Sequence, residues 1–163
     1  MNTRAVAVSA LVAVALVAGA AVQIGVVGDE TTTATVTVVD GEGGDTLATV
    51  SVAVADTDAE RYTGLSDTDS LDRNEGMLFV HPEEGRHTYV MRDMAFPLDI
   101  VFVAADGTVT MIHHAPVESD DDLTEYRGRG KYVLEVPRGF ANRTGLSVGD
   151  RVVVPEEYRK AEE

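Results

Sequence analysis

The chain has 163 residues and a formal net charge of −15, from 28 acidic and 13 basic side chains, and it contains no cysteine. This composition excludes a disulfide framework, a thiol nucleophile and a cysteine metal site, and the absence of a basic stripe disfavours a nucleic-acid partner. Eleven of the bases are arginine and every acid follows Gly28, which indicates a halophilic protein with a hydrated surface or, alternatively, an acidic surface for a cationic partner.

The N-terminal segment is predicted to target the chain to a membrane. Residues 5–27 form an uncharged, largely apolar run with one basic residue before it and two acidic residues after it. A helix of this length spans a bilayer, and the flanking charges favour a domain outside the cytoplasm. We expect residues 1–28 to be either a membrane anchor or a signal peptide cleaved near 18–20, followed by a linker at 29–34.

A predicted β-hairpin and a short helix follow the linker. The segments 35–39 and 47–55 are rich in Val and Thr and are separated by the turn-forming sequence D-G-E-G-G-D. This pattern favours two antiparallel strands. Thr57 and Glu60 have the spacing of a capping box, which predicts a helix over about 58–63.

The remaining sequence predicts several short strands and one more helix. The candidate strands are 77–80, 88–91, 98–104, 109–114 and 131–136, with turns expected at 83–86, 93–97 and 105–108 and a last strand after the Gly149-Asp150 turn. A second short helix is expected at 139–145, and 115–130 is the longest irregular stretch. So many short strands predict one domain at 35–155, mostly β with two short helices, barrel-like or a sandwich, with a polar tail at 156–163.

Five blocks of the sequence resemble a known family. They are R-Y-T-G-L at 61–65, E-G-M-L-F-V at 75–80, V-M-R-D-M-A-F-P-L-D-I-V-F-V at 90–103, G-K-Y-V-L-E-V-P-R-G at 130–139 and G-L-S-V-G-D-R-V at 145–152. In order and spacing they are similar to the prokaryotic family called domain of unknown function 192. The resemblance covers about residues 47–154 and implies a small β-rich domain, often exported, without an assigned activity.

The chain departs from the pattern of that family at three positions. Ser66 stands where methionine is usual, Val90 where an aromatic residue is usual, and Asp93 where a polar amide is usual. If these positions line a pocket, the ligand of this chain differs from that of its relatives.

Asp99 is the first candidate site residue. Strand alternation places Asp99 and Val101 on one face of the segment 98–103, and both faces of this segment are apolar. A buried carboxylate needs hydrogen-bond donors, and we expect Arg61 and Arg92 to supply them. Asp99 then either stabilises the turn before it as a buried ion pair or belongs to a binding site.

Glu135 raises the same question, because it lies between apolar residues in Y-V-L-E-V-P. Together with Asp99 it could form the carboxylate pair of a hydrolase that acts on cell-surface glycans. No Ser-His-Asp motif, phosphate-binding loop or dinucleotide fingerprint is present, so the sequence identifies no catalytic motif.

The favoured hypothesis is a binding or accessory module outside the cytoplasm, with a polar pocket around the turn at 89–99. It would bind an anionic or polyhydroxylated small molecule or a partner protein at the cell surface. The predicted pocket has Arg61 and Arg92 as donors, Asp99 and Glu135 as acceptors, and Met77 and Met91 as apolar walls. A hydrolase and a purely structural domain are the alternatives.

No metal or other cofactor is predicted. The histidines at 81, 87, 113 and 114 lack the spacing that would direct two imidazoles at one ion. Methionines at 77, 91, 94 and 111 could bind Cu(I), but methionine is more often a core residue. Asn142-Arg143-Thr144 is a glycosylation sequon of an exported domain, if it is exposed.

Overall fold

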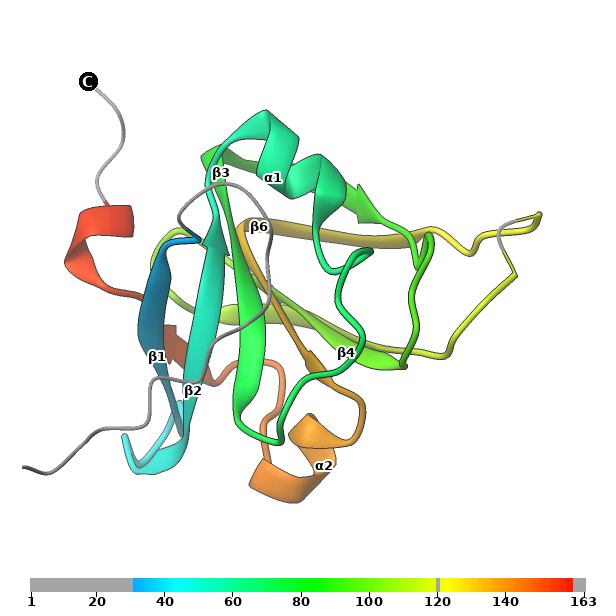
Figure 1. The fold of residues 1–163 in the computed structure, drawn as a ribbon. Coiled ribbons are helices and arrows are strands. Elements are labelled where there is room, and N and C mark those ends of the chain that lie inside the picture. The colour runs from blue at the N-terminus through cyan, green and yellow to red at the C-terminus, as the bar shows by residue number, and fades with distance from the viewer. Residues whose placement is uncertain (1–30, 120, 160–163) are drawn as a thin grey trace, which may run out of the picture.

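A computed structural model describes residues 31–119 and 121–159. The strands are β1 (Thr33–Val39), β2 (Thr46–Ala55), β3 (Glu75–Tyr89), β4 (Leu98–Val103), β5 (Val109–Ala115), β6 (Tyr126–Pro137) and β7 (Arg151–Val153), and the helices are α1 (Asp58–Thr63), α2 (Phe140–Thr144) and the 3-10 turn η1 (Glu156–Tyr158). The strands form one sheet in the order β5-β4-β6-β3-β2-β1-β7 (Figure 1). The predicted fold class, mostly β with two short α-helices in one domain, is confirmed.

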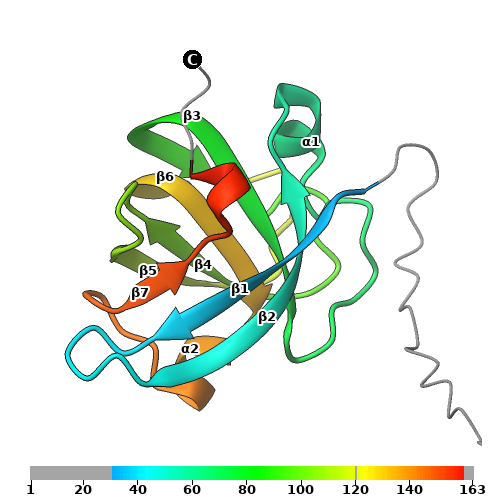
Figure 2. The same ribbon diagram turned by 90° about the vertical axis from the view of Figure 1, so that its left-hand side faces the viewer.

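The sheet curls into a barrel-like shape (Figure 2). Neighbouring strands are antiparallel except β2 and β3, which are parallel and are connected through α1. The two ends of the sheet meet at a bridge between Thr108 and Arg151. Beside this bridge, Val109 N donates to Asp150 O at 2.8 Å and Gly149 N donates to Val109 O at 2.9 Å. These bonds join the start of β5 to the segment that leads into β7.

Two hydrophobic clusters cover the two faces of the central strands, so that all six positions of β4 are buried. The first cluster includes Val36, Val50, Val52, Leu78, Val101, Val103, Leu134 and Val136. The second includes Leu65, Phe79, Met91, Met94, Leu98, Ile100, Phe102 and Val133. The predicted alternation along β4 is therefore confirmed, and the second face is the one that positions the candidate site.

Strand β3 differs from the prediction. Two separate strands were expected at 77–80 and 88–91, with a turn between them. The structure has one strand instead, which runs from Glu75 to Tyr89 and ends before residues 90–91. A register shift between Val80 and Gly85 lets the strand continue its pairing with β6. Because of this pairing β6 begins at Tyr126, within the stretch expected to be irregular.

The predicted membrane segment at residues 5–27 lies outside the described residues. Within residues 31–119 and 121–159, no helix has both the length and the apolar composition needed to cross a bilayer.

Candidate functional site

A cavity of about 340 Å³ lies between α1, with the loop that follows it, and the second face of the sheet. Three of the predicted site residues line it: Arg61 from α1, Arg92 from the segment after β3, and Glu135 from β6. The helix side of the cavity is held close to the sheet at Gly64, which has φ 51°, a conformation that glycine adopts readily. A Cβ atom at Gly64 would lie 3.3 Å from the ring of Phe79.

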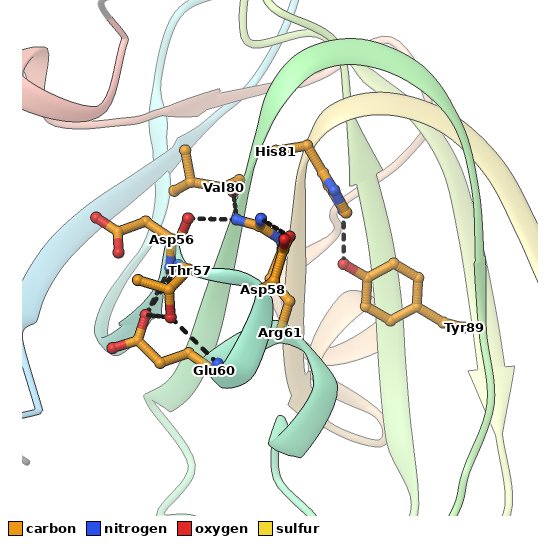
Figure 3. A network of polar contacts seen from close by, with 8 residues as sticks. All are labelled: Asp56, Thr57, Asp58, Glu60, Arg61, Val80, His81 and Tyr89. Atoms are coloured by element: carbon orange, nitrogen blue, oxygen red, sulfur yellow. Dashed lines mark hydrogen bonds and ion pairs between the residues drawn. The ribbon is translucent and has the colours of Figure 1, made fainter. Parts of the chain in front are cut away.

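The helical wall begins with the predicted capping box. Thr57 Oγ1 accepts a hydrogen bond from Glu60 N at 3.3 Å, and Glu60 Oε2 accepts one from Thr57 N at 2.9 Å. Two of the backbone donors at the start of the short helix α1 are thereby satisfied. The cap fixes the first turn of α1, and with it the position of Arg61 (Figure 3).

Arg61 joins α1 to the sheet. Its guanidinium group donates to the carbonyl of Val80 at 2.7 Å and to the carbonyl of Asp56, and it forms an ion pair with Asp58 at 2.6 Å (Figure 3). Since several of its donors are engaged in this way, Arg61 is a rigid, positively charged part of the cavity wall.

Asp99 does not lie in the cavity. Strand register pairs Asp99 with Val136 and Ile100 with Glu135, and side chains of directly opposite residues share a face. Val136 belongs to the first cluster and Ile100 to the second, so Asp99 and Glu135 project from opposite faces of the sheet. The carboxylate pair expected of a glycan hydrolase is therefore wrong, because such a pair must flank one bond.

The predicted arginine partners of Asp99 are also wrong. Asp99 is fully buried, its Oδ1 lies 2.6 Å from His114 Nδ1, and its Oδ2 accepts from Ala141 N at 2.9 Å. The bond to Ala141 satisfies a donor in the first turn of α2, whose N-cap residue makes no side-chain bond. The two arginines line the cavity of the other face, and both oxygens of Asp99 are paired within the fold.

Glu135 has no such partners. Only 5% of its surface is exposed, and its side chain makes no hydrogen bond or ion pair with any residue that the structure describes. On the sheet it is flanked by Met77 of β3 and Ile100 of β4. Burial raises the pKa of Glu135 to about 8, so the carboxyl group is mostly protonated at neutral pH.

The two methionines that were expected as apolar walls of the pocket lie outside the cavity. Met77 is partly buried beside Glu135, and Met91 is buried in the second cluster; neither lines the cavity. Met111 on β5 is 40% exposed. Among the residues that the structure describes, no three His, Asp or Glu side chains are placed to hold a metal ion.

Three polar aromatic side chains of β3, those of His81, His87 and Tyr89, also line the cavity. His81 Nε2 lies 2.9 Å from Tyr89 Oη, and the ring of His81 stacks on that of His87 with centroids 3.5 Å apart (Figure 3 shows His81 and Tyr89). His87 Nε2 lies 3.0 Å from the carbonyl of Gly130. These contacts fix the orientation of all three rings.

The ionisation of these rings follows mainly from burial. Burial, assisted by the charges of His87 and Arg61, lowers the pKa of His81 to about 4. Burial also lowers the pKa of His87, and burial together with the nearby Glu135 raises the pKa of Tyr89. At neutral pH this wall of the cavity is therefore uncharged.

The mouth of the cavity is formed by Arg92 and Tyr62. The guanidinium carbon of Arg92 lies 4.2 Å from the centre of the Tyr62 ring, and its NH2 group donates to the carbonyl of Tyr62. Ser66 Oγ donates to the carbonyl of Arg92 at 2.9 Å. Ser66 and Val90, two of the three departures from the family pattern, line the cavity. At these two positions the cavity wall therefore differs from that pattern.

Sequence reasoning missed His81, His87 and Tyr89 as site residues. His87 and Tyr89 follow His81 by six and eight positions. The three side chains share one wall only because residues 75–89 form one strand with a register shift. Recognition of that continuous strand is the signal that would have found them.

A family model described as "Uncharacterized ACR", the domain of unknown function 192, matches residues 38–154. A solved structure from Sinorhizobium meliloti 1021, of a protein proposed to be a transcription regulator, is 29% identical with a TM-score of 0.70, and the match covers 77% of this chain and 96% of that one. A protein of unknown function from Novosphingobium aromaticivorans DSM 12444 is 32% identical with a TM-score of 0.64, covering 75% and 85%. None of the curated proteins matches the chain.

Proposed function

Given that the chain belongs to the domain of unknown function 192 family, we propose that it is a binding module of that family. It holds a small polar molecule in the cavity between α1 and β3, outside the cytoplasm. The observation that carries this proposal is the carboxyl group of Glu135, which is buried, lines the cavity and lacks a protein partner.

A buried polar group without a hydrogen bond is unfavourable by about 1–3 kcal/mol. A domain that served only as a scaffold would satisfy Glu135 internally, as it satisfies Asp99. None of the fully buried side-chain polar atoms lacks a partner within the described residues, so the unpaired Glu135 oxygens remain accessible from the cavity. A ligand that enters the cavity would satisfy them.

The cavity also has the properties of a preformed site. Its volume of about 340 Å³ lies in the range of small-molecule pockets. Arg61, His81 and His87 are each held by contacts to the protein, so little ordering is required when a ligand binds.

The remaining functions are less well supported. The hydrolase hypothesis relied on Asp99 and Glu135 acting on one bond, which their opposite faces prevent. Regulation of transcription is a description of the Sinorhizobium protein, and the net charge of −15 disfavours contact of this chain with DNA.

The extracytoplasmic location is supported by the apolar run at residues 5–27 and its flanking charges. We expect externally added protease to digest the domain in intact cells if the segment is retained as an anchor, and the domain to be found in the medium if the segment is cleaved. Full-length protein found only in the cytoplasmic fraction would contradict the location.

Binding is tested by thermal unfolding of the detergent-extracted full-length chain against a panel of amino acids, amines, organic acids and sugars. Thr88→Trp places a large ring at an exposed position that lines the cavity. Thr35→Trp is the matched control, since Thr35 is exposed on β1 and does not line the cavity. We expect at least one compound to raise the Tm of the wild type and of Thr35→Trp but not that of Thr88→Trp. The proposal would be contradicted if no compound raises the Tm of the wild type, or if every compound that does so raises the Tm of Thr88→Trp equally.

A further inference from the structure

We propose that the ligand of this cavity is a small zwitterion of the amino-acid type. Its ammonium group would bind Glu135, and its carboxylate would bind the two arginines that line the cavity, Arg61 and Arg92. This inference rests on the proposed binding function and adds the chemical class of the ligand.

The inner end of the cavity favours a donor that carries positive charge. Glu135 lies there beside the apolar side chains of Met77 and Ile100, and its carboxyl group has no donor or cation of its own among the described residues. An ionised carboxylate only accepts hydrogen bonds, and an ammonium group only donates them. In a partly desolvated site such a charged pair is strengthened relative to water.

The outer end favours an anion. Arg61 and Arg92 both line the cavity, and neither forms an ion pair with Glu135. Arg61 is partly neutralised by Asp58 at 2.6 Å, while the closest approach of Arg92 to Asp93 is 3.9 Å. The side chain of Arg92 is 34% exposed and donates to one carbonyl, that of Tyr62. A guanidinium group has five N–H donors, so Arg92 retains donors for a carboxylate.

The two ends together favour a ligand that carries both charges over one that carries a single charge or none. An amine without an acidic group would be repelled by the two arginines, and an acid without an amine would leave Glu135 unsatisfied. A neutral sugar would pair with neither charge. A zwitterion places an opposite charge at each end and bridges Glu135 and the arginines, which form no ion pair with each other.

The space between the ends suits an apolar or aromatic ligand side chain. Phe79, Met94 and Leu98 line the cavity and belong to the second hydrophobic cluster. The rings of His81 and His87 next to them are uncharged at neutral pH, since burial lowers the pKa of both.

Binding of an ammonium group requires Glu135 to lose its proton. Besides Glu135, the titratable and charged groups that line the same cavity are Asp58, Arg61 and Tyr62 of α1, His81, His87 and Tyr89 of β3, and Arg92. The pKa of Glu135 is raised to about 8 and the pKa of His81 is lowered to about 4. Between pH 6.5 and 8 the loss of the Glu135 proton is therefore the main titration that binding involves. At pH 6.5 about one proton is released to solvent per ligand bound, and fewer are released as pH approaches the pKa of Glu135.

The experiment is isothermal titration calorimetry of the full-length chain in detergent. The probes are the common L-amino acids, followed by two analogues of the best binder, one without the amine and one without the carboxylate; for phenylalanine these are 3-phenylpropionate and phenethylamine. We expect the amino acid to bind at least tenfold more tightly than either analogue. Affinity should rise by on the order of tenfold between pH 6.5 and pH 8, and the number of protons released per ligand, measured in buffers of different ionisation enthalpy, should fall from about one at pH 6.5 to about one half near pH 8.

Two variants separate the two ends of the ligand. Glu135→Gln replaces a protonated carboxyl by an amide of similar shape; we expect it to abolish proton release and the preference for the amino acid over the analogue without the amine. Arg92→Gln should abolish the preference over the analogue without the carboxylate and leave proton release unchanged. Thermal unfolding at pH 6.5 checks that both variants are folded.

Several results would overturn the inference. If a sugar binds the wild type without proton release and is blocked by Thr88→Trp, the ligand class is wrong while the binding function stands. The same holds if amines or acids alone bind as tightly as amino acids. If no compound binds in a manner sensitive to Thr88→Trp, both the ligand class and the binding function fall.

Discussion

The buried carboxyl group of Glu135 makes the stability of the ligand-free domain depend on pH in a defined direction. Its pKa is raised from the ordinary value of 4.5 to about 8 in the folded chain. Between these values the folded state binds more protons than the unfolded state, so the free energy of unfolding decreases as pH rises. Each pH unit in this window lowers it by about 1.4 kcal/mol.

His81 opposes this effect at lower pH. Its pKa is lowered from 6.5 to about 4 in the folded chain, so between these values the unfolded state binds more protons and stability increases with pH. The two contributions roughly cancel up to pH 6.5. Above it the opposing contribution of His81, and that of His87, whose pKa is also lowered, fade and the contribution of Glu135 dominates. The net loss between pH 6.5 and about pH 8 is on the order of 1 kcal/mol.

The assay is urea unfolding of the full-length wild type and Glu135→Gln at constant salt, at three pH values from 6.5 to 8. We expect the wild type to lose on the order of 1 kcal/mol over this range and Glu135→Gln to lose none, because the amide does not titrate and the two histidines only add stability as pH rises. Glu83→Gln is the control, since Glu83 is an exposed carboxyl on the same strand pair, and it should keep the wild-type slope. A wild type that is constant over this range, or a Glu135→Gln variant with the wild-type slope, would refute the reasoning.

Three further substitutions test the fold around the site by urea unfolding. Thr57→Ala removes the N-cap of α1 and should lower stability by about 1 kcal/mol; no loss would show that the cap contributes little. Gly128→Ala places a Cβ 2.3 Å from the ring of Phe102 and should be destabilising by about 1–3 kcal/mol or more, whereas Gly85→Ala, with its nearest neighbour at 3.7 Å, should be tolerated far better; equal losses would contradict the close packing. Asp99→Ala should be destabilising by about 3 kcal/mol but leave binding in the folded fraction unchanged; a change in affinity would contradict the placement of Asp99 on the other face.

The fold class could be predicted because it follows from local patterns. The alternation along 98–103 identified a strand with two apolar faces, and all six positions are buried. The capping box of Thr57 and Glu60 located the start of α1, and both of its hydrogen bonds are present. Each of these signals lies within a few residues of the chain.

Strand β3 was misread because its continuity depends on distant residues. Pro82 and Gly85 favour a turn locally, and a turn was expected there. The pairing of residues 85–89 with 126–130 of β6 outweighs that preference and keeps the strand extended. Such a long-range pairing is not visible in a local pattern of the sequence, and the histidines of the cavity wall were missed for the same reason.

The site was half predicted. Arg61, Arg92 and Glu135 line one cavity, as expected of a common site, whereas Asp99 lies on the opposite face. Alternation within one strand shows which of its residues share a face. It does not show which residues of the neighbouring strand lie on that same face of the sheet. That relation depends on the register between β4 and β6.

The contrast between the two buried carboxyl groups is the strongest argument that the cavity is functional. Asp99 and Glu135 lie on adjacent strands, and both are at least 95% buried. The fold satisfies Asp99 through His114 and the first turn of α2, so this domain can accommodate a buried carboxylate when the group serves structure. Glu135 is left unpaired among the described residues at a place where a cavity reaches it, with Arg61 and Arg92 held apart from it. The carboxyl group of Glu135 destabilises the fold towards pH 8, and an apolar residue could take its place in the core. It is therefore better explained as a partner for a ligand than as a component of the core.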